Sequence, residues 1–118
     1  MSDSTIPPCG PERDRLVAEA VGWKFFTLGG KSWCSIGVTG RAMLPSQSDA
    51  DALAALEAWR TVPDTIRSYV LSAPNIIDPE WRLSLDTDFD ELTRASAPTL
   101  RDAATAALVR WRNERSEV

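Results

Sequence analysis

The sequence predicts an α+β fold in which helices pack on an antiparallel four-stranded sheet, with elements in the order α-β-β-α-β-β-α. Three segments carry apolar residues at helical spacing, and two pairs of short aromatic or β-branched runs lie between them. Turn-forming glycine or proline residues separate the two runs of each pair. Runs joined by short turns pair as antiparallel strands, and helices cover the apolar face of the resulting sheet.

The first predicted helix covers residues 11–21. Proline is common in the first helical turn, which places Pro11 at the start, and Gly22 suits the C-terminal cap. Two extended runs follow at residues 23–28 and 32–38, and the Gly-Gly step between them is typical of a hairpin turn. This part of the chain is therefore predicted to form a helix followed by a two-stranded hairpin.

The second predicted helix begins at a capping signal. Ser48, followed three residues later by Asp51, is a variant of the capping box, and the helix is expected to run to about Arg60. Residues 66–72 fit either a helical face or a strand. We favour a strand because a second extended run, residues 81–85, follows after a plausible turn.

The last predicted helix has the clearest pattern in the chain. Apolar residues recur at positions i, i+3, i+4, i+7, i+8 and i+11 between Leu100 and Trp111. Charged residues and a threonine occupy the opposite side. This spacing predicts a helix that packs one face against the core.

Length and composition predict a flexible leader, residues 1–10, followed by a single domain, residues 11–115. A chain of 118 residues suits one core. No apolar run approaches the roughly 20 residues that span a bilayer, and the N-terminus lacks signal-peptide features, so we expect a cytoplasmic protein without membrane contact. Cys9 and Cys34 are accordingly expected to be free thiols.

Histidine is absent from the chain, which excludes many catalytic mechanisms. Ser-His-Asp and Cys-His nucleophile systems need it, and two cysteines alone cannot complete a tetrahedral zinc site. We therefore expect neither an enzyme nor a bound metal ion or cofactor. The net charge of −4 argues against direct nucleic-acid binding. The oligomeric state is left open.

Several local features occur in one order along residues 12–111: the Gly22-Trp23 step, the helix start at residues 48–51, Trp59, the strand around Trp81, and the helix start at residues 95–103. In this order they resemble the small phage-encoded proteins grouped as the phage ABA sandwich domain family. The resemblance implies a three-layer sandwich of phage or prophage origin, with no catalytic residues to carry over. The chain departs from the family pattern in its proline-rich leader and at residues 76–79.

Acidic residues in the second half of the chain form the leading candidate site. Their negative surface would meet a basic groove on a protein partner, because complementary charge steers association and sets specificity. The candidate partner-binding residues are Asp78, Glu80, Asp86, Asp88, Asp90 and Glu91. The predicted function is a non-catalytic phage accessory protein that binds a host protein, for example as an inhibitor of a CRISPR complex or another nucleic-acid-binding defence component.

An alternative function is the binding or sequestering of a small nucleotide. Trp33 would stack on a base while Arg41 and Arg67 contact its phosphates. The other tryptophans fall on the apolar faces of predicted elements and are expected to pack in the core: Trp23, Trp59, Trp81 and Trp111.

Overall fold

The computed structural model describes residues 6–35, 42–62, 66–87 and 92–116. Within these residues the elements follow in the order α1 (Pro11–Val21), β1 (Lys24–Leu28), β2 (Lys31–Ser35), α2 (Asp49–Arg60), β3 (Arg67–Ser72), β4 (Trp81–Thr87), β5 (Leu92–Ala97) and α3 (Leu100–Ser116). The α+β class is confirmed. The strands form two antiparallel sheets, however, β1-β2 and β3-β4-β5, so the prediction of one four-stranded sheet is wrong.

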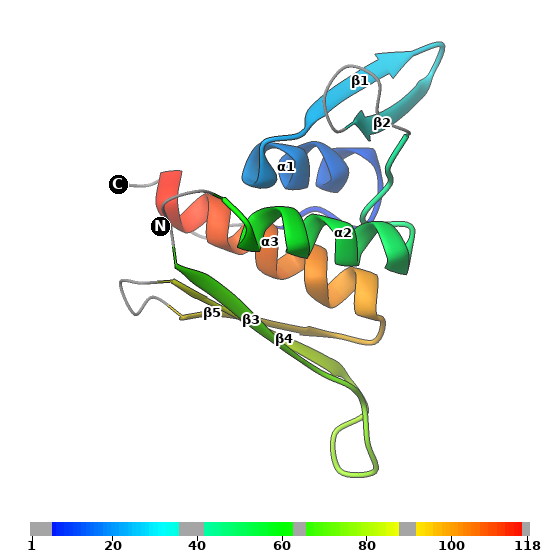
Figure 1. Ribbon diagram of the computed structural model, residues 1–118. Helices are drawn as coiled ribbons and strands as arrows, with labels where there is room; N and C mark the ends of the chain where they lie inside the picture. The colour runs from blue at the N-terminus through cyan, green and yellow to red at the C-terminus, as the bar shows by residue number, and fades with distance from the viewer. Residues whose placement is uncertain (1–5, 36–41, 63–65, 88–91, 117–118) are drawn as a thin grey trace.

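The helices lie between the two sheets (Figure 1). α1 contacts the β1-β2 hairpin, α2 contacts β3, and α3 contacts β4 and β5 as well as both other helices. The helical layer thus keeps the hairpin away from the three-stranded sheet. Local sequence patterns indicate which neighbouring strands pair. Whether the two pairs then join in a single sheet depends on long-range packing, which such patterns do not reveal.

α1 and the hairpin have the predicted local structure. Pro11 opens α1, and Gly22 caps its end with φ 82°, while the Gly22 N–H donates to the Ala18 oxygen at 2.9 Å. Gly29 and Gly30 both have positive φ, 62° and 81°, which a two-residue turn between β1 and β2 requires and glycine adopts easily. The predicted helix bounds and the predicted hairpin are therefore confirmed, while residues 36–38 of the second predicted run lie outside the described residues.

The start of α2 and the conformation of residues 66–72, for which the sequence allowed a helix or a strand, are both defined by the structure. The Ser48 side chain accepts a hydrogen bond from the Asp51 backbone N–H at 3.3 Å, so the predicted cap is confirmed. β3 is a strand and pairs antiparallel with β4, with Tyr69 opposite Leu85. The strand interpretation of this segment is therefore confirmed.

β5 was not predicted from the sequence. Its side chains that face the helices are small, namely Thr93, Ala95 and Ala97, so this face lacks the large apolar residues that usually indicate a strand. These small residues pack against α3, whose buried face is itself rich in alanine. Small side chains on both sides allow the helix and the strand to approach closely.

Two buried tryptophans pack against each other in the core, and the half-buried Arg67 lies beside both rings. Trp59 is 0% exposed and makes a T-shaped contact with Trp111, with 5.7 Å between ring centroids. The Arg67 guanidinium lies 5.2 Å from the Trp59 ring and 4.8 Å from the Trp111 ring. Trp23 is also buried, as predicted, whereas Trp81 is only half-buried.

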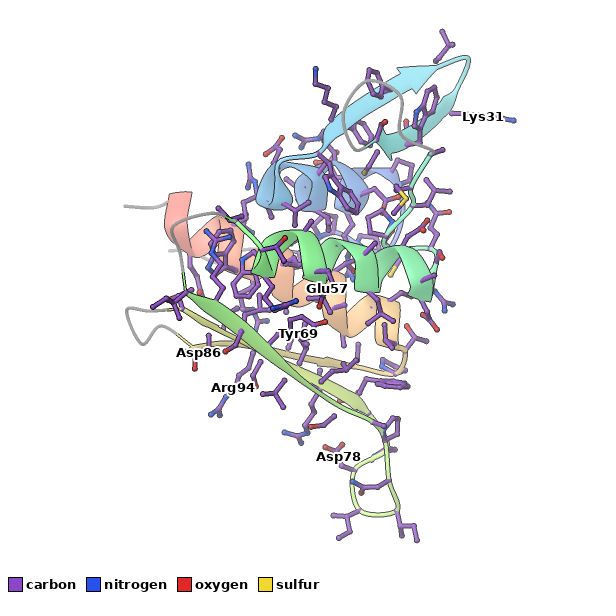
Figure 2. The ribbon with its side chains drawn as sticks, viewed as in Figure 1. Lys31, Glu57, Tyr69, Asp78, Asp86 and Arg94 are labelled. Carbon is purple, nitrogen blue, oxygen red and sulfur yellow. The ribbon has the colours of Figure 1, made fainter. Side chains whose placement is uncertain are left out.

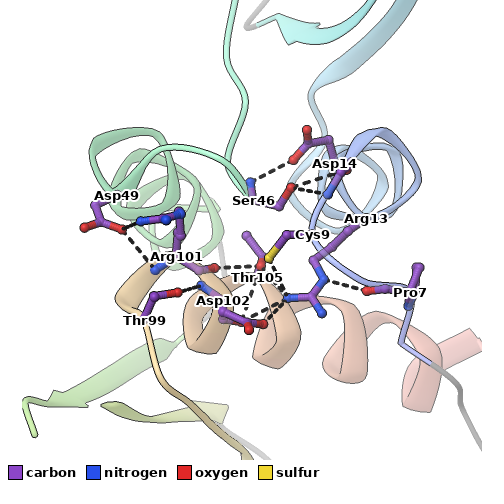
Figure 3. Close-up of polar contacts among 11 residues, drawn as sticks. Pro7, Cys9, Arg13, Asp14, Ser46, Asp49, Thr99, Arg101, Asp102 and Thr105 are labelled. Atoms are coloured by element: carbon purple, nitrogen blue, oxygen red, sulfur yellow. Dashed lines mark hydrogen bonds and ion pairs between the residues drawn. The ribbon is translucent and has the colours of Figure 1, made fainter. Parts of the chain in front are cut away.

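Arg13 of α1 joins three parts of the chain (Figure 3). Its Nε donates to the Pro7 oxygen at 2.8 Å, and its Nη1 donates to Thr105 Oγ1 at 3.1 Å and forms an ion pair with Asp102. These contacts hold α1 against α3 and bring the end of the predicted leader against both helices. Residues 1–5 of that leader lie outside the described residues.

Asp14, next to Arg13, fastens α1 to the segment before α2 (Figure 3). Its side chain is 0% exposed and accepts hydrogen bonds from the Ser46 backbone N–H at 2.7 Å and from Gln47 Nε2 at 3.1 Å. Ser46 Oγ in turn accepts from the Gly10 N–H at 2.9 Å. The buried carboxylate therefore has donors that offset its removal from water.

We expect only one cysteine of the folded chain to react with iodoacetamide. Both are free thiols, as predicted, but Cys9 is exposed whereas Cys34 is buried, and its Sγ donates to the backbone oxygen of Asp14 at 3.3 Å. Burial, and then the charges of Asp14 and Asp51, raise the pKa of the Cys34 thiol to about 12, so almost no reactive thiolate forms at pH 8. Mass spectrometry should show one modification per folded chain and two after denaturation. The Cys9→Ser variant is the control, and fast labelling of that variant would contradict the buried position of Cys34.

Candidate functional site

The three-stranded sheet has one face against the helices and one open face. Side chains alternate between the two faces along each strand. We call the open side the outer face. The strand register arranges its residues in cross-strand rows: Ser72, Arg82 and Ser96; Val70, Ser84 and Arg94; and Ser68 with Asp86.

A pocket of about 460 Å³ lies on this face and at the edge of β5. Its polar lining comes from the outer face and from Arg110 of α3: Ser72, Arg82, Ser84, Arg94, Ser96 and Arg110. Arg110 reaches the sheet edge, where its Nη1 donates to the backbone oxygen of Arg94 at 2.7 Å. This hydrogen bond places the guanidinium of a helix residue at the rim of a pocket formed mainly by strands.

The loop between β3 and β4 is held in a tight turn by Asn75. Its side-chain oxygen accepts from the backbone N–H groups of Ile77 and Asp78, both at 2.8 Å. Ile76 is fully exposed and Ile77 is 93% exposed at the tip of this loop, which projects from the sheet in Figure 1. The turn therefore presents two adjacent apolar side chains to solvent, next to the outer face.

The structure does not gather the described acidic candidates into one patch. Asp78 and Asp86 lie towards opposite ends of β4, and Arg94 lies between them on the outer face (Figure 2). Asp78 forms an ion pair with Arg82, and Glu80 is half-buried. Three further candidates lie outside the described residues: Asp88, Asp90 and Glu91.

Asp78 has a structural role in the loop. Its carboxylate accepts from the Glu80 backbone N–H at 3.2 Å and from Arg82 Nε. The Glu80 N–H, and then the Arg82 guanidinium, lower the pKa of Asp78, because both stabilise its charged form. Its negative charge is therefore partly neutralised within the chain.

The residues of the predicted nucleotide site are not brought together either. Trp33 lies on the hairpin and stacks on Phe26, with 5.9 Å between ring centroids. Arg67 lies on β3, on the far side of the helical layer, where it packs between two core tryptophans and donates to the Trp59 oxygen at 2.9 Å. Arg41 is outside the described residues.

Sequence reasoning missed Arg94 and Arg110 as candidate functional residues. The only sequence signal is the alternation of polar residues at Arg94 and Ser96, which becomes meaningful once residues 92–97 are recognised as a strand. Arg110 comes from a different element and approaches β5 through tertiary packing alone.

The part of the chain that the structure describes contains no helix with the length and apolar character needed to cross a bilayer. It also holds no group of three or more cysteine and acidic side chains that is arranged to bind a metal ion. Comparison of the chain with protein-family models and with curated proteins gives no match.

Proposed function

We propose that this protein is a non-catalytic phage accessory protein that binds a host protein in the cytoplasm and inhibits a bacterial defence system such as a CRISPR complex. The phage origin is supported by the resemblance to the phage ABA sandwich domain family. The binding role is supported by the outer face, which no described element covers.

Apolar side chains exposed beside charged ones are the observation that carries this proposal. Ile76 and Ile77 project from the loop, and Val70 on the outer face is 65% exposed. Protein interfaces combine such apolar anchors with a polar rim in which arginine is common, and they bury about 800 Å² on each partner. Fully exposed neighbouring isoleucines have no packing role within the chain, so they are the natural anchors of an interface.

The acidic residues give the partner surface a preferred charge. Asp86 is exposed on the outer face, and in the sequence it is followed closely by Asp88, Asp90 and Glu91. The Asp86 carboxylate would meet a basic surface, such as the nucleic-acid groove of a defence complex. The proposed partner is therefore a protein with a basic groove beside an apolar pocket.

The double variant Ile76→Ser/Ile77→Ser is expected to lose inhibition. In cells whose CRISPR system targets a plasmid, the wild-type chain should raise transformation efficiency, and the double variant should reduce this gain by about tenfold or more, as loss of an interface anchor does. Transformation counts and the affinity of purified chain for the targeting complex measure the effect. Folding should be unchanged because both side chains are in solvent.

Leu28→Ser is the matched control, since Leu28 is 73% exposed but lies at the tip of the β1-β2 hairpin, far from the loop. It should inhibit as well as the wild type. If Leu28→Ser lost inhibition while the double variant inhibited fully, the interface would lie on the hairpin and not on the loop. Absence of inhibition and of complex formation by the wild-type chain would refute this function.

A further inference from the structure

The pocket at the edge of β5 is lined by hydrogen-bond donors. Its polar side chains are three arginines and three serines, and its described lining contains no carboxylate. An arginine side chain only donates hydrogen bonds, and a serine hydroxyl donates readily. A ligand that fits this lining must therefore be rich in acceptors.

The described lining of the pocket also carries a net positive charge. Arg94 is exposed on the outer face, and among the described residues its guanidinium has no carboxylate partner. Arg110 donates to a neutral backbone oxygen, and of the three arginines only Arg82 forms an ion pair with a described residue, Asp78. Asp86 stands in the next row of the outer face, on the other diagonal of Arg94, but it does not line the pocket. The described lining thus carries three guanidinium groups and no carboxylate, and neighbouring like charges repel one another unless an anion binds between them.

Strand register fixes the spacing of these groups. Arg94 lies opposite Ser84, and Arg82 lies opposite Ser96 in the next row, so the two arginines stand on a diagonal of adjacent strands. Diagonal neighbours are about 7–8 Å apart, which long side chains bridge easily. Both guanidinium groups can therefore reach one ligand from different directions, with Arg110 at the rim.

The size and lining of the pocket distinguish between anions. About 460 Å³ falls in the range of small-molecule sites, roughly 300–1,000 Å³, and exceeds what a single carboxylate needs. A carboxylate offers about four acceptor positions. The three arginines and three serine hydroxyls together can donate more hydrogen bonds than that. The described lining contains no aromatic side chain on which a base would stack.

We propose that this pocket binds the diphosphate group of a small phosphorylated ligand through Arg82, Arg94 and Arg110, with serine hydroxyls completing the contacts. Planar guanidinium groups match phosphate oxygens in pairs, which makes arginine the usual residue for such groups. Recognition is of the phosphates and not of an attached base. The pocket lies on the same outer face as the protein interface proposed above and shares Val70 with it, but phosphate binding needs only residues of this chain and can be measured without the partner.

Titration with inorganic pyrophosphate at low ionic strength tests the proposal. Calorimetry should show saturable binding to the wild-type chain, and amide NMR signals of β4 and β5 should shift. Arg94→Gln should weaken pyrophosphate binding by about tenfold or more, and it should leave the fold intact because the side chain is exposed. Arg60→Gln removes the same charge from an exposed site on α2 and should change the affinity by less than about twofold.

Two further ligands separate phosphate recognition from other causes. Adenosine and uridine diphosphates should bind with the affinity of pyrophosphate within about threefold, since no described side chain of the pocket stacks on the base. Citrate, which offers carboxylates alone, should bind at least about tenfold more weakly. The proposal is wrong if pyrophosphate does not saturate the wild-type chain, if both arginine variants bind it equally, if citrate matches it, or if one base gives much tighter binding.

Discussion

Replacing Trp59 with alanine is expected to lower the free energy of unfolding by about 3–5 kcal/mol. The Trp59 side chain, which comes from α2, is fully buried and contacts the Trp111 ring edge to face. Its removal takes away apolar burial and leaves a cavity that the rigid surroundings fill only partly. It also removes one of the two rings beside Arg67, whose cation–π contact adds to the loss.

Urea unfolding followed by circular dichroism measures this change in Trp59→Ala. Trp59→Phe is the control, because it keeps an aromatic ring opposite Trp111 and creates a smaller cavity, so its loss of stability should be clearly smaller. A loss below about 1 kcal/mol for the alanine variant, in the range of surface substitutions, would show that this tryptophan is not at the centre of the core.

Replacing Asp14 with alanine should cost about 2–3 kcal/mol of stability. The variant leaves the Ser46 backbone N–H without its acceptor in a buried position and also frees the Gln47 side-chain amide. An unsatisfied buried donor is more costly than the average hydrogen bond is favourable, because its hydration is lost without replacement. The segment before α2 should also loosen, since Asp14 connects it to α1.

Thermal and urea unfolding of Asp14→Ala, Asp14→Asn and Asp49→Ala test this role. The asparagine retains an oxygen that can accept from Ser46 N–H, so its loss should be smaller than that of alanine. Asp49 is exposed and contacts Arg101 at 3.3 Å, a surface ion pair worth less than about 1 kcal/mol. Equal stability of Asp14→Ala and Asp49→Ala would mean that the buried carboxylate does not hold these segments together.

The features that the sequence predicted correctly are local ones, whose conformation depends on residues close by in the chain. The cap at Gly22, the Gly29-Gly30 turn and the Ser48 cap are set by backbone preferences within a few residues, and the structure contains all three. β5 escaped prediction because its burial is achieved with alanine and threonine against an alanine-rich helix. Its strand conformation is imposed by pairing with β4, a contact that a local pattern does not reveal.

The candidate site was less predictable than the fold for the same reason. Carboxylates are conspicuous in the sequence between residues 78 and 91, so they dominated the sequence-based prediction. The arginines of the pocket are far apart in the chain and meet only through the pairing of β4 with β5 and the packing of α3. Without β5, no register could place Arg82 and Arg94 on one face.

The contact of Arg110 with β5 covers part of an open edge of the three-stranded sheet. β5 is an edge strand, and the free backbone groups of such an edge can pair with a strand of another molecule, which leads to aggregation. The Arg110 guanidinium occupies one of these backbone acceptors, the Arg94 oxygen, and brings a positive charge to the edge. An incoming strand would have to displace this hydrogen bond and bury the charge. One side chain of α3 thus hinders the pairing of this sheet edge with another chain.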